Sequence, residues 1–174
     1  MVRDKEATKS KLLDAALAEF AAHGIAGARV DRIAAKAGCN KAMIYAYFGS
    51  KEELFDEVLK IQISLVHEAT PLTPDDLPGF AGRLYDTYAR QPELLRLAGY
   101  HRLESGFEEI SKAEAEAHAL KVAAIEEAQR DGRVPADFGA EELLNLVVHM
   151  SILAFSTPIA SRDLVVRSVE KLVS

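Results

Sequence analysis

The residues with the most distinctive types and spacing lie between Ala28 and Leu59, in the stretch ARVDRIAAKAGCNKAMIYAYFGSKEELFDEVL. A short segment with helical periodicity, Val30 to Ala37, is followed by a turn containing Gly38 and by a second short segment, Lys41 to Tyr47. Glycine at such a turn lets two helices meet at a steep angle, which is the geometry of a helix-turn-helix. In that motif the second helix enters the major groove of DNA, so the spacing predicts contacts to phosphates and base edges.

The second segment has distinct inner and outer faces. Ile44 and Phe48 are four residues apart, so they share one face of a helix and are expected to pack inward. Asn40 precedes the segment as an N-cap, and Ser50 with Glu53 forms a capping box that begins the next helix. The outward positions are expected to be Ala42, Met43, Tyr45 and Ala46.

This segment resembles the tetracycline-repressor (TetR) family of bacterial regulators, over about residues 9–60. The residues that carry the resemblance are Val30, Ile33, Ala34, Ala37, Gly38, Lys41, Tyr45, Tyr47, Phe48 and Ser50 to Leu54. The rest of the chain resembles the family only in length and helix content. The resemblance implies an all-helical fold, a homodimer, and DNA binding that a small-molecule effector controls.

The resemblance also implies roles for single residues. By position, Lys41, Tyr47 and Lys51 contact the phosphates of double-stranded DNA, and Tyr45 contributes partly to the core and partly to a phosphate contact. Arg29 stands where the family commonly has threonine, so a helix cap is lost and a cation that can reach a phosphate is gained. Bases of a palindromic operator are expected to be read by Asn40, Ala42, Met43 and Ala46. The alternative is a helical hairpin that binds no DNA.

The charge of the chain is unevenly distributed. Residues 1–51 contain 9 Lys and Arg against 5 Asp and Glu, whereas residues 52–174 contain 12 against 22, which gives the net charge of -6. A basic N-terminal part suits contact with a polyanion. A split of this size also arises by chance, so the charge alone decides little.

Helical periodicity extends along the whole chain, which predicts an all-α fold. We expect an N-terminal helix-turn-helix domain over residues 1–50 and a helical bundle over 51–174 that senses a ligand and dimerises, with the fourth helix, 51–67, as the connector. The fifth helix begins either at Pro74 or only after Gly79. The nine expected helices cover 4–23, 30–37, 41–47, 51–67, a fifth ending near 90, 92–104, 107–130, 140–156 and 163–173.

The eighth expected helix is apolar on nearly every face between Leu143 and Phe155. A helix of this kind must be buried on all sides, so a second copy of the chain is expected to cover it. The alternative is a monomer in which this helix is central. The residues predicted for the dimer interface are Val147, Val148, Ile152, Phe155, Leu164, Val165, Val169 and Leu172.

Aromatic and polar side chains interrupt the apolar faces of the predicted bundle, as in the lining of a small-molecule pocket. His149 is the strongest single candidate, and its alternative role is that of a core or interface histidine. A second alternative is that the bundle binds a protein partner instead of an effector. The candidate effector-binding residues are Tyr85, Tyr88, Tyr100, His101, Glu104, Phe107, His118 and His149.

The sequence argues against an enzyme. None of the five histidines has Glu three residues before it, as a di-metal bundle requires, and no phosphate-binding loop or nucleophile elbow is present. We therefore expect no catalytic residues, metal or cofactor. Cys39 is alone, the N-terminal segment is charged, and no stretch of about 20 apolar residues occurs, so we expect a soluble cytoplasmic protein that does not enter a membrane.

Overall fold

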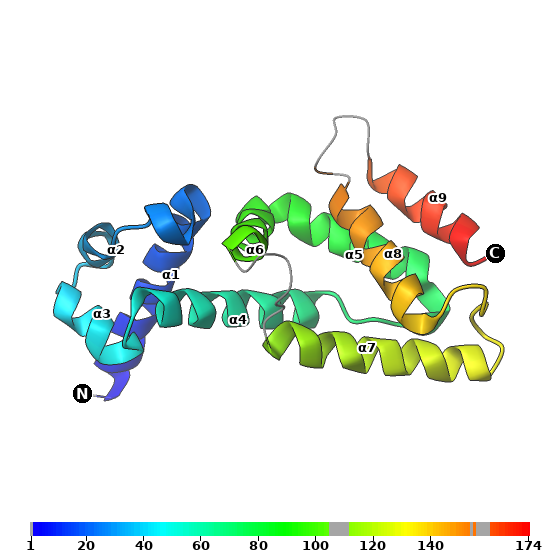
Figure 1. Ribbon diagram of the computed structural model, residues 1–174, viewed down its shortest axis with the longest axis horizontal. Coiled ribbons are helices and arrows are strands. Elements are labelled where there is room, and N and C mark those ends of the chain that lie inside the picture. The colour runs from blue at the N-terminus through cyan, green and yellow to red at the C-terminus, as the bar shows by residue number, and fades with distance from the viewer. Residues whose placement is uncertain (1, 105–111, 154, 156–160) are drawn as a thin grey trace. The chain divides into compact units, whose positions relative to one another are not determined.

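The computed structural model describes residues 2–104, 112–153, 155 and 161–174, and over these ranges its regular structure is helical throughout (Figure 1). The expected all-α fold is therefore confirmed. The chain forms two compact units: Met1–Gln62 with Pro92–Ser111 is unit 1, and Ile63–Gln91 with Lys112–Ser174 is unit 2. Unit 1 includes the later segment Pro92–Ser111, so no single boundary in the sequence separates the two units. The domain boundary expected at residue 50 stays a prediction.

Unit 1 contains α1 (Val2–Gly27), α2 (Val30–Ala37), α3 (Lys41–Phe48), α6 (Pro92–Glu104) and the part of α4 (Lys51–Ala69) that ends at Gln62. Helix α1 was expected to stop at Gly24, and its backbone does leave the helical conformation there, with φ 66°, before one more turn to Gly27. The ring of Tyr100 from α6 packs on this kink, where a Cβ on residue 24 would lie 3.1 Å from Tyr100 Cδ1. Glycine is thus needed both for the backbone angle and for the close approach of α6.

The core of unit 1 joins all of its helices. Phe20 of α1 meets Phe55 of α4 edge to face, with ring centroids 5.2 Å apart. Ile33 of α2 and Ile44 of α3 are fully buried with them. Short helices such as α2 and α3 are marginal on their own, so this shared core determines their positions.

Unit 2 contains the last turns of α4, the 3-10 helix η1 (Pro74–Asp76), α5 (Leu77–Arg90), α7 (Lys112–Arg130), α8 (Ala140–Leu153) and α9 (Arg162–Leu172). Neither expected start of the fifth helix is correct, because η1 covers Pro74 and α5 begins at Leu77. Pro78 is tolerated in the first turn, where its missing N–H would have no partner. Asp76 caps α5 by accepting a hydrogen bond of 2.9 Å from the Gly79 amide.

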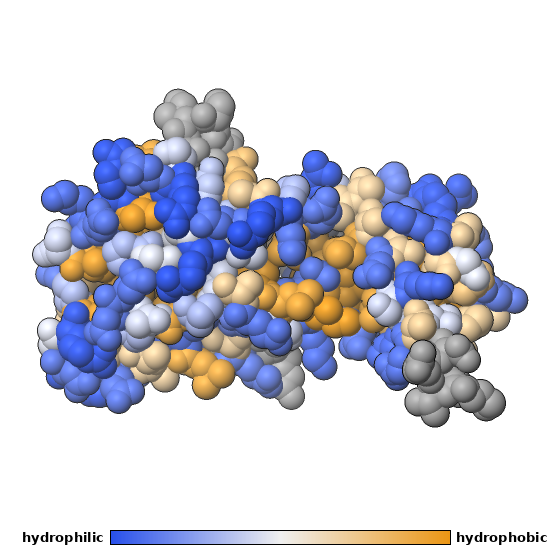
Figure 2. All heavy atoms as spheres, turned by 180° about the vertical axis from the view of Figure 1, so that it is seen from behind, coloured by the Kyte–Doolittle hydropathy of each residue, from blue (hydrophilic) through white to orange (hydrophobic). Residues whose placement is uncertain are grey.

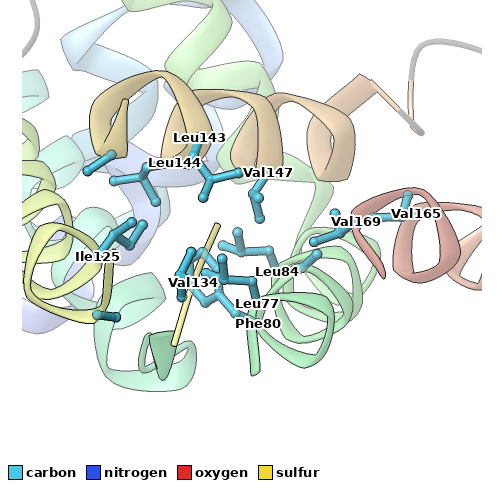
Figure 3. Close-up of a cluster of buried hydrophobic side chains, with 13 residues drawn as sticks. Leu77, Phe80, Leu84, Ile125, Val134, Leu143, Leu144, Val147, Val165 and Val169 are labelled. Carbon is cyan, nitrogen blue, oxygen red and sulfur yellow. The ribbon is translucent and has the colours of Figure 1, made fainter. Parts of the chain in front are cut away.

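The core of unit 2 is formed by α5, α7, α8 and α9 (Figure 3). Figure 3 shows Leu77, Phe80 and Leu84 of α5 below Leu143, Leu144 and Val147 of α8, with Ile125 of α7 on one side and Val165 and Val169 of α9 on the other. Ser151 of α8 is a buried polar residue here, and its hydroxyl donates to the carbonyls of Val147 and Ala81. This core fixes which face of α8 points inward.

The burial of α8 and α9 corrects part of the predicted dimer interface. Val147, Val165 and Val169 are at most 4% exposed within one protomer, so they have no surface to offer a second copy. Val148 and Leu172 are half-buried against the same core, and Ile152 is half-buried. Of the predicted interface residues, Phe155 and Leu164 are exposed.

Helix α8 has exposed apolar side chains that were not predicted for the dimer interface. Leu146 and Leu153 are 36% and 63% exposed, and they are seven residues apart, which places them on one face of the helix. Figure 2 shows one face of the molecule, on which hydrophobic residues (orange) reach the surface among hydrophilic residues (blue). Helix α8 is therefore buried on one side only.

In the part of the chain that the structure describes, none of the helices has the length and apolarity to span a bilayer.

Candidate DNA-binding site

Helix α3 has one buried and one bare face, as the spacing of its residues predicts. Ile44 is fully buried and Phe48 nearly so, while Met43 and Tyr47 are half-buried. The exposed residues of the helix are Lys41, Ala42, Tyr45 and Ala46. Tyr45 is 44% exposed, so part of its side chain is buried and part is available at the surface.

The turn before α3 is built by local hydrogen bonds. Gly38 ends α2 in the left-handed conformation, at φ 68° and ψ 34°, and the amide of Cys39 donates to the Ala34 carbonyl at 3.0 Å. The side-chain oxygen of Asn40 accepts a hydrogen bond of 2.9 Å from the Ala42 amide, which confirms the N-cap. Because this oxygen is occupied, Asn40 has its side-chain amide group left for a base.

The N-terminus of α2 is held by a carboxylate from another helix. Arg29 is the N-cap residue of α2, and its side chain makes no capping bond, as the loss of threonine predicts. Glu19 of α1 accepts hydrogen bonds from the Arg29 amide at 2.9 Å and from Nε of Arg32 at 2.7 Å. Arg32 also donates to the Gly27 carbonyl at 3.0 Å, so α1 and α2 are linked on both sides of their connection.

The charge state of Glu19 follows from these contacts. Its side chain is 10% exposed. Burial raises the pKa of the Glu19 carboxyl, but the hydrogen bonds from Arg32 and Arg29 and the charges of Arg32 and His23 outweigh it and lower that pKa below the ordinary value. The carboxylate also lies at the positive end of the α2 dipole, where a negative charge is favourable.

Lys41, the first residue of α3, is paired with an acidic residue of α2. Its Nζ lies 2.9 Å from Oδ1 of Asp31, and both side chains are exposed. The hydrogen bond to Asp31 raises the pKa of the Lys41 ammonium. A contact between Lys41 and a DNA phosphate would therefore require Lys41 to exchange or share this partner.

Lys51, the first residue of α4, is also hydrogen-bonded inside unit 1. Its half-buried ammonium donates to the Ile25 carbonyl at 2.7 Å, directly after the kink of α1. The capping box of the same helix is present on its serine side, because the Glu53 amide donates to the Ser50 hydroxyl at 3.0 Å. Lys51 thus ties α4 to α1, and two of its N–H donors remain for a phosphate.

The residues predicted for an effector pocket do not belong to one unit. Tyr100 and His101 are on α6 in unit 1, where His101 stacks on Phe55 with ring centroids 6.1 Å apart. The side chain of Glu104 and the whole of Phe107 lie outside the described residues. The other four candidates are in unit 2: Tyr85, Tyr88, His118 and His149.

Within unit 2, these four candidates lie in different surroundings. Tyr85 stacks on Phe155 with centroids 4.9 Å apart, and Tyr88 packs against the core. Nε2 of His118 lies 3.9 Å from Oε1 of Glu141. His149 is exposed, and its Nδ1 donates to the Asn145 carbonyl at 2.7 Å, so the ring lies along the outer face of α8. Over the described residues, His, Cys, Asp and Glu side chains form no group of three suited to a metal ion.

Glu19 and Asp31 are functional candidates that the sequence did not indicate. Their partners are 13 and 10 residues away along the chain, because Glu19 binds Arg32 and Asp31 binds Lys41. A contact between helices has no fixed spacing, so a sequence pattern cannot identify it. One sequence feature could have indicated Glu19. Arg29 stands where the family commonly has threonine, so the start of α2 lacks a side-chain cap of its own and needs an acceptor from elsewhere.

Two family profiles together cover most of the chain. The profile described as "Bacterial regulatory proteins, tetR family" matches residues 12–58. The profile described as "Tetracyclin repressor-like, C-terminal domain" matches residues 76–171. The first match includes α2, α3 and the start of α4, and the second includes α5 to α8 and nearly all of α9.

Individual proteins agree with the profiles. The HTH-type transcriptional repressor SCO4008 of Streptomyces coelicolor is 47% identical over 165 residues, which are 94% of this chain and 86% of that protein. The HTH-type transcriptional repressor NicS of Pseudomonas putida is 35% identical over 106 residues, 57% of this chain and 50% of that protein. The crystal structure of a transcriptional regulator, SCO4942 of Streptomyces coelicolor, superposes with a TM-score of 0.82 at 35% identity, covering 95% of this chain and 98% of that one.

The role of Glu19 predicts a stability change that depends on pH. Glu19→Gln should lower the free energy of unfolding at pH 7 by about 1–2 kcal/mol, because it removes a charged acceptor of two hydrogen bonds. Since the folded pKa of Glu19 is lowered, its contribution is complete above the ordinary value of 4.5 and is lost as the pH falls through the folded pKa. The difference between the two proteins, measured by urea unfolding, should therefore shrink below pH 4.5. Asp14→Asn, an exposed change on the same helix, is the control, and a Glu19→Gln protein as stable as wild type at pH 7 would contradict this role.

The pairing of Lys41 predicts a gain of DNA affinity. Asp31→Asn should tighten binding to duplex DNA about three- to tenfold at low salt, because it frees the Lys41 ammonium and removes a negative charge beside α3. Fluorescence anisotropy over a salt series measures this. Asp137→Asn, an exposed change in unit 2, alters the net charge equally and should have little effect. Equal affinities for Asp31→Asn and wild type would show that Lys41 does not face the phosphates.

Proposed function

Because the chain belongs to the tetracycline-repressor (TetR) family and is a DNA-binding transcriptional regulator, not an enzyme, we propose that it represses genes from a palindromic operator until a small-molecule effector releases it. The observation that carries this proposal is the exposed face of α3, which lies opposite the buried side chains of Ile44 and Phe48. A recognition helix of this size enters the major groove through its N-terminal residues. Here these are Lys41, Ala42 and Met43.

The chemistry of the exposed face suggests how DNA is contacted. Lys41, Tyr47, Lys51 and the exposed Arg29 supply phosphate contacts, which set affinity and register but carry no base preference. Ala42, Met43 and Ala46 supply apolar contacts suited to thymine methyl groups. The Asn40 amide group adds a hydrogen-bond donor to a base edge.

A dimer would satisfy the apolar residues left on the surface of unit 2. Leu146 and Leu153 of α8 and Leu164 of α9 are large apolar side chains with substantial exposure on neighbouring helices. Exposed apolar side chains of this size are typical of an interface when they form one patch. Two copies related by a two-fold axis would place two copies of α3 on a palindrome, about 34–36 Å apart for half-sites one helical turn apart.

Control by an effector requires a connection between the units, and α4 provides one. It begins at Lys51, which is bonded to α1, and its last turns belong to unit 2, where Val66 packs against the core. A ligand that favours one orientation of α4 changes the spacing of the recognition helices. By linkage, that ligand and DNA alter each other's affinity by the same factor.

Selection of binding sites from random duplexes tests the DNA-binding half of the proposal. The selected sequences should share a palindrome with half-sites about 10 base pairs apart or a multiple of that spacing, because a two-fold dimer imposes its symmetry on the operator. Affinity for the selected site should fall steeply as salt rises. Tyr47→Phe and Lys41→Ala should weaken binding, whereas Lys171→Ala, an exposed change on α9, should not. A protein that selects no sequence over random DNA would contradict the proposal.

Charge reversal of surface leucines tests the proposed dimer. Leu153→Asp should convert a sedimenting dimer into a monomer, because an unpaired charge in a closed interface costs several kcal/mol. Leu120→Asp is the matched control, since Leu120 on α7 is 76% exposed and lies outside the proposed interface. The interface assignment fails if both variants remain dimeric, or if the wild type is a monomer at micromolar concentration.

A further inference from the structure

The connection between α4 and α5 covers residues 70–76, and most of these residues are exposed. Exposed connections are usually more mobile than the helices that they join. This connection, however, is bound by two arginines of unit 2. The first is Arg83 of α5, which donates from Nη1 to the Asp76 carboxylate at 3.1 Å and from Nη2 to the Pro71 carbonyl at 3.3 Å.

The second arginine comes from another part of the same unit. Arg133 follows the end of α7 and donates from Nη1 to both carboxylate oxygens of Asp75, at 2.8 and 3.0 Å. The backbone of Arg133 is itself fixed, because its amide donates to the Ala128 carbonyl at 2.9 Å and the next residue, Val134, is buried in the core. The bond from Arg133 therefore ties the connection to the core of unit 2.

The end of α4 is fixed at the start of this connection. Thr70 is fully buried, and its hydroxyl and its amide donate to the Val66 carbonyl at 2.6 and 2.9 Å. Val66 and Leu72 pack against the core. Over the described residues, Nε of Arg83 is buried without a hydrogen-bond partner. An unpaired buried donor destabilises a fold, so Arg83 binds the connection at a cost to stability.

Helix α4 transmits this anchoring to the DNA-binding part of the chain. It begins at Lys51, which is bonded to α1, and its last turns belong to unit 2. The direction in which α4 leaves unit 2 is therefore set where its end is fixed. In a dimer on a palindrome, that direction sets the distance between the two recognition helices. One base pair of DNA changes this distance by only about 3.4 Å, so a small change of direction is sufficient to spoil the match.

We propose that Arg83 and Arg133 are positioning residues for operator binding. They fix the end of α4 in unit 2, and thereby the distance at which the dimer presents its two recognition helices. This inference rests on the function proposed above. Neither arginine needs to touch DNA. Loss of both adds dimers with other distances, and affinity for the operator falls in proportion to the fraction of dimers that still match it.

Operators of altered spacing test this role in the full-length protein. The selected operator is compared with duplexes in which one base pair is inserted or removed at its centre. Wild-type protein should bind the selected operator at least about tenfold more tightly than the altered ones. For Arg83→Gln/Arg133→Gln this ratio should fall at least about threefold, because other distances become populated. Affinity for a single half-site should stay unchanged, since unit 1 is intact.

A matched control separates positioning from a general loss of stability or charge. Arg130→Gln/Arg162→Gln removes the same charge from two other ion pairs of unit 2, with Glu126 and Asp86. Neither pair includes a residue of the α4–α5 connection. This variant should keep the spacing ratio of the wild type.

Hydrogen exchange without DNA tests the anchor itself. In Arg83→Gln/Arg133→Gln, the backbone amides at the end of α4, including that of Thr70, should exchange at least about tenfold faster than in the wild type. Asp75→Asn is a milder second variant, because it changes an exposed residue and leaves both arginines in place. It should change the exchange in the same direction, whereas Arg130→Gln/Arg162→Gln should not change it.

The outcomes separate this inference from the proposed function. The anchor is overturned if exchange at the end of α4 is the same as in the wild type for both Arg83→Gln/Arg133→Gln and Asp75→Asn. The positioning role is overturned if exchange accelerates but the spacing ratio does not fall, or if Arg130→Gln/Arg162→Gln lowers that ratio equally. If the chain selects no palindrome, the proposed function fails and the positioning role fails with it. Hydrogen exchange then still decides whether the two arginines anchor α4.

Discussion

The position of α3 relative to α1 and α2 is the constraint on which the rest of unit 1 depends. Helix α3 has eight residues and buries Ile44 and Phe48, while its other face is exposed. Burial of two side chains anchors a helix weakly, so the angle of α3 is determined by its neighbours. The hydrogen bonds of Glu19 to α2, the packing of Tyr100 on Gly24 and the bond from Lys51 to Ile25 fix those neighbours.

The cations near α3 have structural partners before any DNA is bound. Arg32 is bonded to Glu19, Lys41 to Asp31, and Lys51 to a backbone carbonyl. If these cations contact DNA as proposed, binding exchanges one set of partners for another, and the acidic residues oppose that exchange. Unit 2 differs in Lys121, whose ammonium lies over the ring of Phe80 and forms no ion pair with a carboxylate among the described residues.

Features that depend on neighbours in sequence could be predicted. The N-cap at Asn40, the left-handed Gly38 and the capping serine at position 50 each depend on residues a few positions away, and all are present. The inward direction of Ile44 and Phe48 followed from their four-residue spacing. These local signals were sufficient to predict the helix-turn-helix.

Features that depend on contacts between helices could not be predicted. An apolar run on α8 does not show which side faces the core, so the buried Val147 was predicted for the dimer interface and the exposed Leu146 was not. The partners of Glu19 and Asp31 have no sequence signature. The effector candidates were chosen by residue type, whereas their division between units follows from the packing of α6 on α1.

An NMR titration of the isotope-labelled protein with its selected operator duplex shows directly which helices bind DNA. If the bare face of α3 enters the groove, the backbone amide signals of Lys41, Ala42, Tyr45 and Ala46 should shift most, together with those at the N-termini of α2 and α4. Signals of buried residues such as Leu144 should shift least. If the largest shifts occur in unit 2 and the signals of α3 do not change, DNA does not bind through α3.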